Sequence, residues 1–179
     1  FKKQFKIFIM KTTVLKFFTL SVAIFAFSNI SFGQSSVTGT ADAGANILKP
    51  IAIINTQDLD FGDIISQTAA FTVTVSTAGE RSATNATAIL NAVGKQAIFS
   101  VTGQENQSFK VTLPTDGVVS IESGENSMNI TGFNHNFGAT PKLNGSGNAT
   151  LNVGAVLNVG ATQAAGEYTG TFDVTVAYE

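Results

Sequence analysis

Short runs of alternating apolar and polar residues recur along most of the chain, and this period of two is the feature that most limits its fold. In "FTVTV", at residues 71–75, Phe and Val alternate with Thr. Gly, Asn or Asp separates most runs, which is typical of turns between strands. After Gly33, no run of 12 or more residues has the apolar period of 3.6 that predicts an amphipathic helix. The pattern therefore predicts an all-β protein with about nine or ten strands.

Each run has one apolar face, which favours antiparallel strands with one buried and one solvent-exposed side. Two such sheets packed face to face would bury all the apolar faces, so the expected fold is an immunoglobulin-like antiparallel β-sandwich. The runs fill residues 50–179 without an internal boundary, and we expect one domain there. The only stretch that resembles a helix, "ATNATAILNAVGKQ" at residues 83–96, is rich in Thr and Asn and is expected to be strand or loop.

The last run, residues 164–179, has the strongest alternation in the chain. Its apolar face carries Tyr168, Phe172, Val174, Val176 and Tyr178. Burying five such side chains contributes on the order of 8–15 kcal/mol before any opposing cost. A strand at the border of a sheet also has backbone donors and acceptors that need partners. We therefore expect this strand to be an assembly edge, or to lie beside one, where another chain adds a strand.

Residues 1–33 are expected to be upstream residues and a signal peptide. Lys11 and Lys16 precede an apolar stretch at residues 17–27, and small residues lead up to Gly33. A membrane-spanning helix would need about 20 apolar residues, so we expect cleavage after Gly33 and no stable membrane span afterwards. The predicted location is the periplasm, the cell surface or the extracellular space of a bacterium.

The charge of the remaining chain limits its partners. Five of the ten Lys and Arg residues and none of the twelve acidic residues precede Gln34, so the rest of the chain has a net charge of −7. An acidic exported protein has no electrostatic reason to bind nucleic acid or anionic lipid. The chain has no Cys, so its stability must come from an apolar core and not from disulfides.

Residues 34–49 form a leading segment with the same period of two but small side chains. Its candidate inward positions are Val37, Ala41, Ala43, Ala45 and Ile47. The favoured interpretation is that it forms the first strand of its own sandwich. The alternatives are that it is donated as a strand to a neighbouring chain, or that it is a loose terminus.

Few residues in the chain could carry chemistry, so we expect neither an enzyme nor a cofactor or metal. His135 is the only His. Asp58, Asp60 and Asp63 lie in "DLDFGD", which lacks the Gly and the terminal Glu of an EF-hand loop. A solvated strand face and turn is expected there in preference to a calcium site.

An alternative function is a monomeric β-sandwich that binds a ligand such as a surface glycan. The best candidate is a loop at residues 134–148, which is rich in Asn and Gly. Phe133, His135 and Phe137 would supply aromatic contacts to a sugar ring.

Several longer stretches resemble a known family of secreted bacterial proteins, the domain of unknown function 4402. The similar stretches are "ILKPIAIINTQDLDFGDI", "GERSAT", "FSVTG", "FKVTLP", "NSMNITGF", "LNVGAVLNV" and "QAAGEYTGTFDVTVAYE". This family looks related to pilin and spore-coat-protein-U type subunits, through "LDFG" at residues 59–62 and the closing strand at residues 166–178. The resemblance implies an incomplete immunoglobulin-like fold completed by a strand of the next subunit, and hence a pilin-like surface protein with homo-oligomeric or pilin-like neighbours. Common pilins carry a disulfide, which this chain lacks.

Overall fold

The computed structural model describes residues 35–90 and 94–179, and these residues form an all-β structure with antiparallel sheets. The predicted signal peptide at residues 1–33 lies outside the described residues. The chain divides into two units, Phe1–Ala45 and Asn46–Glu179, and all the strands that the structure describes belong to the second. In the described part of the chain, no helix has the length and apolar character needed to cross a membrane.

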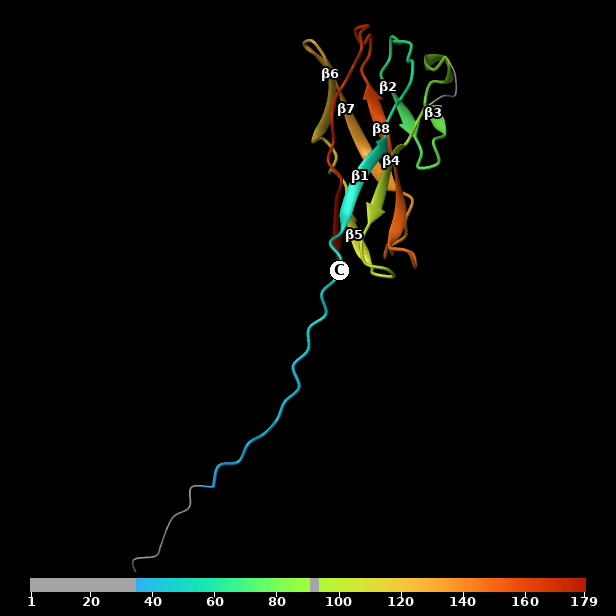
Figure 1. The fold of residues 1–179 in the computed structure, drawn as a ribbon. Helices are drawn as coiled ribbons and strands as arrows, with labels where there is room; N and C mark the ends of the chain where they lie inside the picture. Colours follow the sequence, from blue (N-terminus) through green and yellow to red (C-terminus); the bar gives the residue numbers. More distant parts are fainter. Residues whose placement is uncertain (1–34, 91–93) are drawn as a thin grey trace, which may run out of the picture. The chain divides into compact units, whose positions relative to one another are not determined.

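Nine strands and one short 3-10 turn make up the regular structure of the described residues (Figure 1). The strands are β1 Ala52–Gln57, β2 Phe71–Val75, β3 Arg81–Ala83, β4 Ala97–Thr102, β5 Phe109–Thr112, β6 Val119–Ser123, β7 Asn126–His135, β8 Asn148–Val159 and β9 Thr175–Tyr178. The turn η1, Ala86–Ala88, lies in the stretch that the sequence assigns to strand or loop.

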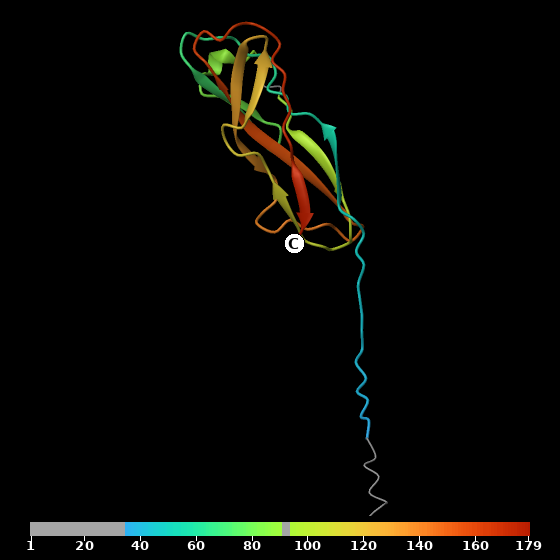
Figure 2. The ribbon, with the colours of Figure 1, turned by 90° about the vertical axis from the view of Figure 1, so that its left-hand side faces the viewer.

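The strands form a sheet of seven and a sheet of two (Figures 1 and 2). The larger sheet has the order β1-β4-β8-β2-β3, with β7 also paired to β8 and β6 paired to β7. The smaller sheet consists of β5 and β9. The long strand β8 connects the larger sheet, because it pairs with β4 through its first half, with β2 through its second half, and with β7.

Strand β8 forms the centre of the core. Alternate side chains along it are buried with at most 3% of their surface exposed: Leu151, Val153, Ala155, Leu157 and Val159. The two apolar runs on either side of Gly154 therefore belong to one continuous strand. A Cβ atom at Gly154 would lie 2.5 Å from the carbonyl oxygen of Val75, so the end of β2 passes directly over this glycine. Only glycine permits this approach of two backbones.

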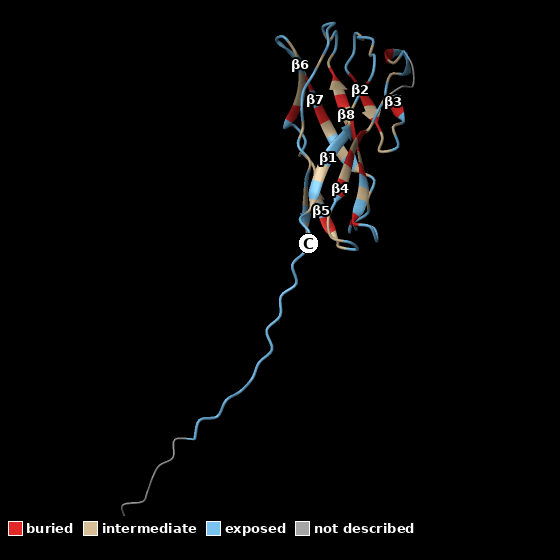
Figure 3. Cartoon of the chain, in the orientation of Figure 1, coloured by how far each residue is buried: buried red, intermediate tan, exposed pale blue. Residues whose placement is uncertain are grey.

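Buried residues, red in Figure 3, lie mostly along the strands. Their side chains form two clusters that share a border: one contains Val73, Val75 and Leu157, and the other contains Phe109 and Leu151. Three half-buried side chains pack against both clusters: Leu59, Phe133 and Phe172. In the second cluster, side chains of β5 and β9 contact side chains of β4 and β8, so the two sheets bury a common core.

The closing strand is shorter than its alternation predicts. Strand β9 covers only Thr175–Tyr178, and an isolated bridge between Thr169 and Glu122 precedes it. The alternation itself persists, since Tyr168, Phe172, Val174, Val176 and Tyr178 are half-buried while the residues between them are exposed. A strand is defined by its backbone hydrogen bonds to a neighbouring strand, and not by which side chains are buried. No described strand pairs with residues 171–174, so these residues are not part of β9.

The leading segment does not form the strand that the sequence favours. Residues 35–51 contain no strand and no bridge to another strand. Val37 keeps 93% of its surface exposed and Ile47 keeps 92%, and Ala41, Ala43 and Ala45 are also exposed. Small side chains gain little from burial, so a first strand built on Ala and Gly is weakly held by its own domain. Donation of this segment to a neighbour stays a prediction.

Candidate functional site

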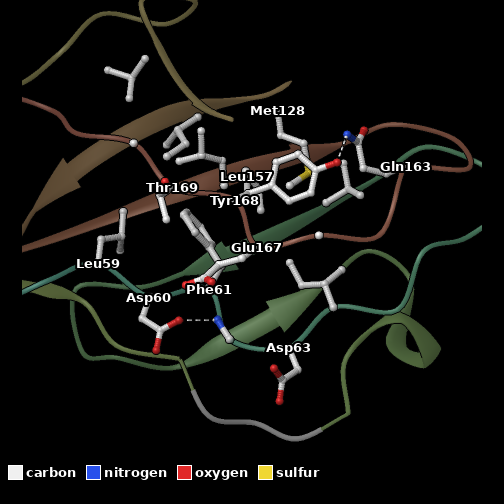
Figure 4. A pocket seen from close by; sticks show the side chains of 18 of the residues that line it. Leu59, Asp60, Phe61, Asp63, Met128, Leu157, Gln163, Glu167, Tyr168 and Thr169 are labelled. Atoms are coloured by element: carbon white, nitrogen blue, oxygen red, sulfur yellow. Dashed lines mark hydrogen bonds between the residues drawn. The ribbon is translucent and has the colours of Figure 1, made fainter. Parts of the chain in front are cut away.

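A groove of about 950 Å³ lies between residues 58–66 and residues 163–172 (Figure 4). Its floor is apolar and consists of Val119, Ile121, Met128, Ile130, Leu157 and Val159. Phe61, Val119 and Met128 each keep 8% of their surface exposed, and Leu157 keeps 1%. The floor of the groove is therefore made of core side chains that are largely buried by their neighbours.

The first wall of the groove is a segment whose hydrogen bonds face away from it. The backbone of Asp60 donates to the carbonyl of Lys95 at 2.8 Å, and Lys95 donates back to Asp60 at 2.9 Å. Along an antiparallel strand, successive residues direct their N–H and C=O groups to opposite sides. The backbone groups of Leu59 and Phe61 therefore face the groove. The wall ends in a turn in which Gly62, at φ 65°, donates to Asp60 Oδ1 at 2.8 Å (Figure 4).

The second wall follows the same rule. Thr169 exchanges two backbone hydrogen bonds with Glu122, at 3.0 and 2.9 Å, and Glu179 donates to Ser108, the residue before β5, at 3.4 Å. Odd-numbered residues along this segment therefore direct their backbone groups toward β5 and β6. The even-numbered ones direct theirs to the other edge: Tyr168, Gly170, Phe172, Val174 and Val176. In the described residues, β9 is paired on one side only, so this edge carries no strand.

The two walls run in opposite directions. Each pairing from β1 through β4, β8, β7 and β6 to Thr169 is antiparallel, so five reversals separate the first wall from the second. An extended chain placed between them would be parallel to one wall and antiparallel to the other. The first wall spans residues 58–66 and the second spans residues 163–172, and the turn at Gly62 interrupts the first.

Arg81 supports the first wall from behind. This side chain is buried, with 7% of its surface exposed, and its guanidinium donates to the carbonyl oxygen of Asp63. Burial lowers the pKa of Arg81, while the negative charges of Asp63 and Asp60 act in the opposite direction. The guanidinium thus fixes the segment that carries both carboxylates.

Charged side chains along the groove are mostly acidic. Among the described residues that line it are four carboxylates and one ammonium group: Asp58, Asp60, Asp63, Glu167 and Lys95. This gives a net charge of −3, which Arg81 behind the wall reduces to −2. Asp58 and Glu167 are exposed and form no ion pair with other described residues.

Two tyrosines of the predicted assembly edge are held by hydrogen bonds within the domain. The hydroxyl of Tyr178 accepts from the backbone of Gln104 at 2.6 Å and donates to the carbonyl of Lys49 at 2.8 Å. The hydroxyl of Tyr168 accepts from Gln163 Nε2 at 2.9 Å and donates to Ala164 at 2.8 Å (Figure 4). Tyr168 and Phe172 line the groove, whereas Val174, Val176 and Tyr178 pack into the second cluster.

The aromatic residues proposed for glycan binding are placed differently from the prediction. Phe133 and His135 lie in β7 and not in a loop. The ring centroids of Phe133 and Phe172 are 5.0 Å apart, and those of Phe137 and Phe109 are 5.6 Å apart. His135 Nδ1 accepts a hydrogen bond from the backbone of Phe137 at 3.2 Å. Both phenylalanine rings thus contact the core, and glycan binding stays a prediction without a structural observation in its favour.

Asp58, Asp60 and Asp63 lie along the first wall and do not converge on one point. Asp58 Oδ1 accepts from Asn55 at 3.1 Å, and Asp60 Oδ1 accepts from Gly62. Within residues 35–90 and 94–179, no group of three or more His, Cys, Asp or Glu side chains is arranged to hold a metal ion.

Sequence reasoning identified the closing strand but missed the groove beside it. The floor residues Val119 and Met128, each 8% exposed, have the same alternation as Val73 and Val75, which are 0% exposed. Alternation shows which face of a strand is apolar, but it does not show whether another strand covers that face. The only available signal was indirect, because "LDFG" and the closing strand, both noted in the sequence, form the two walls.

The fold defines an all-β domain with antiparallel sheets and a groove whose floor is made of apolar core residues. A family model for a domain of unknown function (DUF4402) matches residues 51–178. The chain therefore belongs to the DUF4402 family. No curated protein and no solved structure matches the chain.

Proposed function

We propose that the domain is an incomplete immunoglobulin-like β-sandwich that accepts an extended strand of another chain, as part of a pilin-like structural protein exported to the bacterial surface. The observation that carries the proposal is the groove, whose floor is apolar and whose walls pair with no described strand on the side of the groove. A strand placed there would pair with both edges and contact Val119, Ile121 and Met128 on the floor.

The energetic reason for accepting a strand has two parts. Free backbone donors and acceptors along Leu59, Phe61, Phe172 and Val174 would gain partners in a place from which water is partly excluded. The strand's inward side chains would also bury apolar surface, at about 25 cal/mol per Å². The acidic charge and the expected signal peptide are consistent with an exported subunit.

The test is a binding measurement with synthetic peptides of about ten residues. One peptide alternates Val with polar residues, and its control has the same composition with the Val residues in one block. We expect the alternating peptide to bind, measured by fluorescence anisotropy, and to protect the amide hydrogens of Phe172 and Val174 from exchange. Equal binding of both peptides, or binding without protection of these amides, would refute strand addition in the groove.

A further inference from the structure

The walls of the groove carry an excess of negative charge that bears on what it binds. Asp58 and Glu167 are exposed, lie on opposite walls and form no ion pair with any other described residue. Among the described residues of the lining, Lys95 is the only one with a basic side chain, and Arg81 is directed to Asp63 behind the first wall. A strand in the groove would place its inward residues on the apolar floor and its outward residues between these carboxylates.

We propose that the natural occupant of the groove is a strand of a different protein, with apolar residues on its inward face and Lys or Arg on its outward face. This inference rests on the strand-accepting function proposed above. The outward cations would lie close to Asp58 and Glu167, where a groove bordered by low-dielectric walls strengthens their attraction relative to open solvent.

The leading segment of a second copy fits this site less well. Residues 35–48 contain one charged residue, Asp42, and no Lys or Arg. Most of the candidate inward residues are Ala, which would cover little of a floor built from Val, Ile, Met and Leu. A second copy would also bring the net charge of −7 of residues 34–179 toward an identical charge. Charge complementarity therefore favours a cationic partner strand over self-association.

The experiment compares peptides that share inward Val and Ile residues and differ at three outward positions, which are Lys, Gln or Glu. The Lys peptide is expected to bind the purified protein about tenfold more tightly than the Glu peptide at about 0.05 M salt. The difference should shrink at about 0.5 M salt, since screening weakens exposed charge pairs. The combined substitution Asp58→Asn and Glu167→Gln should remove most of the difference. Glu80→Gln with Glu125→Gln, away from the groove, should preserve it.

Two further peptides complete the design. A peptide with the outward Lys residues but inward Gly and Ser should bind weakly; equally tight binding would show mere charge attraction and overturn the proposal. A peptide of residues 35–47 should bind less tightly than the Lys peptide, and the reverse order would also overturn it. Binding of all Val/Ile peptides with equal affinity would overturn the cationic preference and leave strand addition intact. Failure of every Val/Ile peptide to bind would refute strand addition itself.

Discussion

Individual side chains hold the ends of this domain in place. Tyr178 is the clearest case, because its single hydroxyl satisfies the backbone of Gln104 and of Lys49, which lie 74 and 129 positions away in the chain. Arg81 has a comparable role at the first wall of the groove, where its buried guanidinium binds the carbonyl of Asp63. Both side chains connect segments that strand ladders do not join.

Replacing Tyr178 by Phe should lower the free energy of unfolding by about 1 kcal/mol or more, because it leaves the Gln104 amide without its partner. Urea denaturation measures this. Tyr168→Phe is the matched control, since the hydroxyl of Tyr168 bonds only within five residues of itself and should cost less. Equal losses in the two variants would show that the long-range connection has no special value.

At the scale of strands, the sequence predicts more about side-chain faces than about partners. Period-two alternation correctly predicts an all-β structure and the inward face of the closing strand, because burial follows the pleat. It does not predict that residues 171–174 lack a ladder, or that the runs around Gly154 join into β8, since pairing depends on residues far away in the chain. The groove could not be predicted for the same reason, because the alternation does not show which strands lie beside an apolar face.

Strand β8 supplies one prediction. Gly154→Ala should lower the free energy of unfolding by about 1–3 kcal/mol, because the new methyl group would meet the Val75 carbonyl and force the strands apart. Gly145→Ala is the control, as nothing lies within 4 Å of a Cβ at that position. Chemical denaturation of both variants measures the difference. An unchanged free energy of unfolding in Gly154→Ala would show that the backbone of Val75 is not in close contact with Gly154.

Strand β9 supplies another, in the form of alternating amide protection. The amide of Ala177 faces β5 and should exchange at least about 100-fold more slowly than the amide of Val176, which faces the open edge. Residue-resolved hydrogen exchange of the unbound protein measures both. Similar protection of the two amides would mean that a strand already covers this edge in solution.

At the scale of the whole molecule, all the described strands belong to the unit Asn46–Glu179, and the exposed residues 35–45 belong to the other unit. Deleting residues 34–46 should therefore leave the free energy of unfolding within about 0.5 kcal/mol of its original value. Under the cationic-partner proposal, native size-exclusion chromatography should also show the same oligomer distribution. Loss of an oligomer on deletion would instead identify the leading segment as the donated strand.

The hydroxyl of Tyr178 has a mechanical consequence for any molecule anchored through this domain. Tension applied to the chain ahead of Lys49 arrives first at a residue that is tied to Tyr178 by its carbonyl, to Gln104 by its amide and to Glu105 by its ammonium group. These three interactions would have to break before the force acts on the hydrogen bonds between β1 and β4. Lys49 is therefore the residue through which a pulling force would first reach the domain.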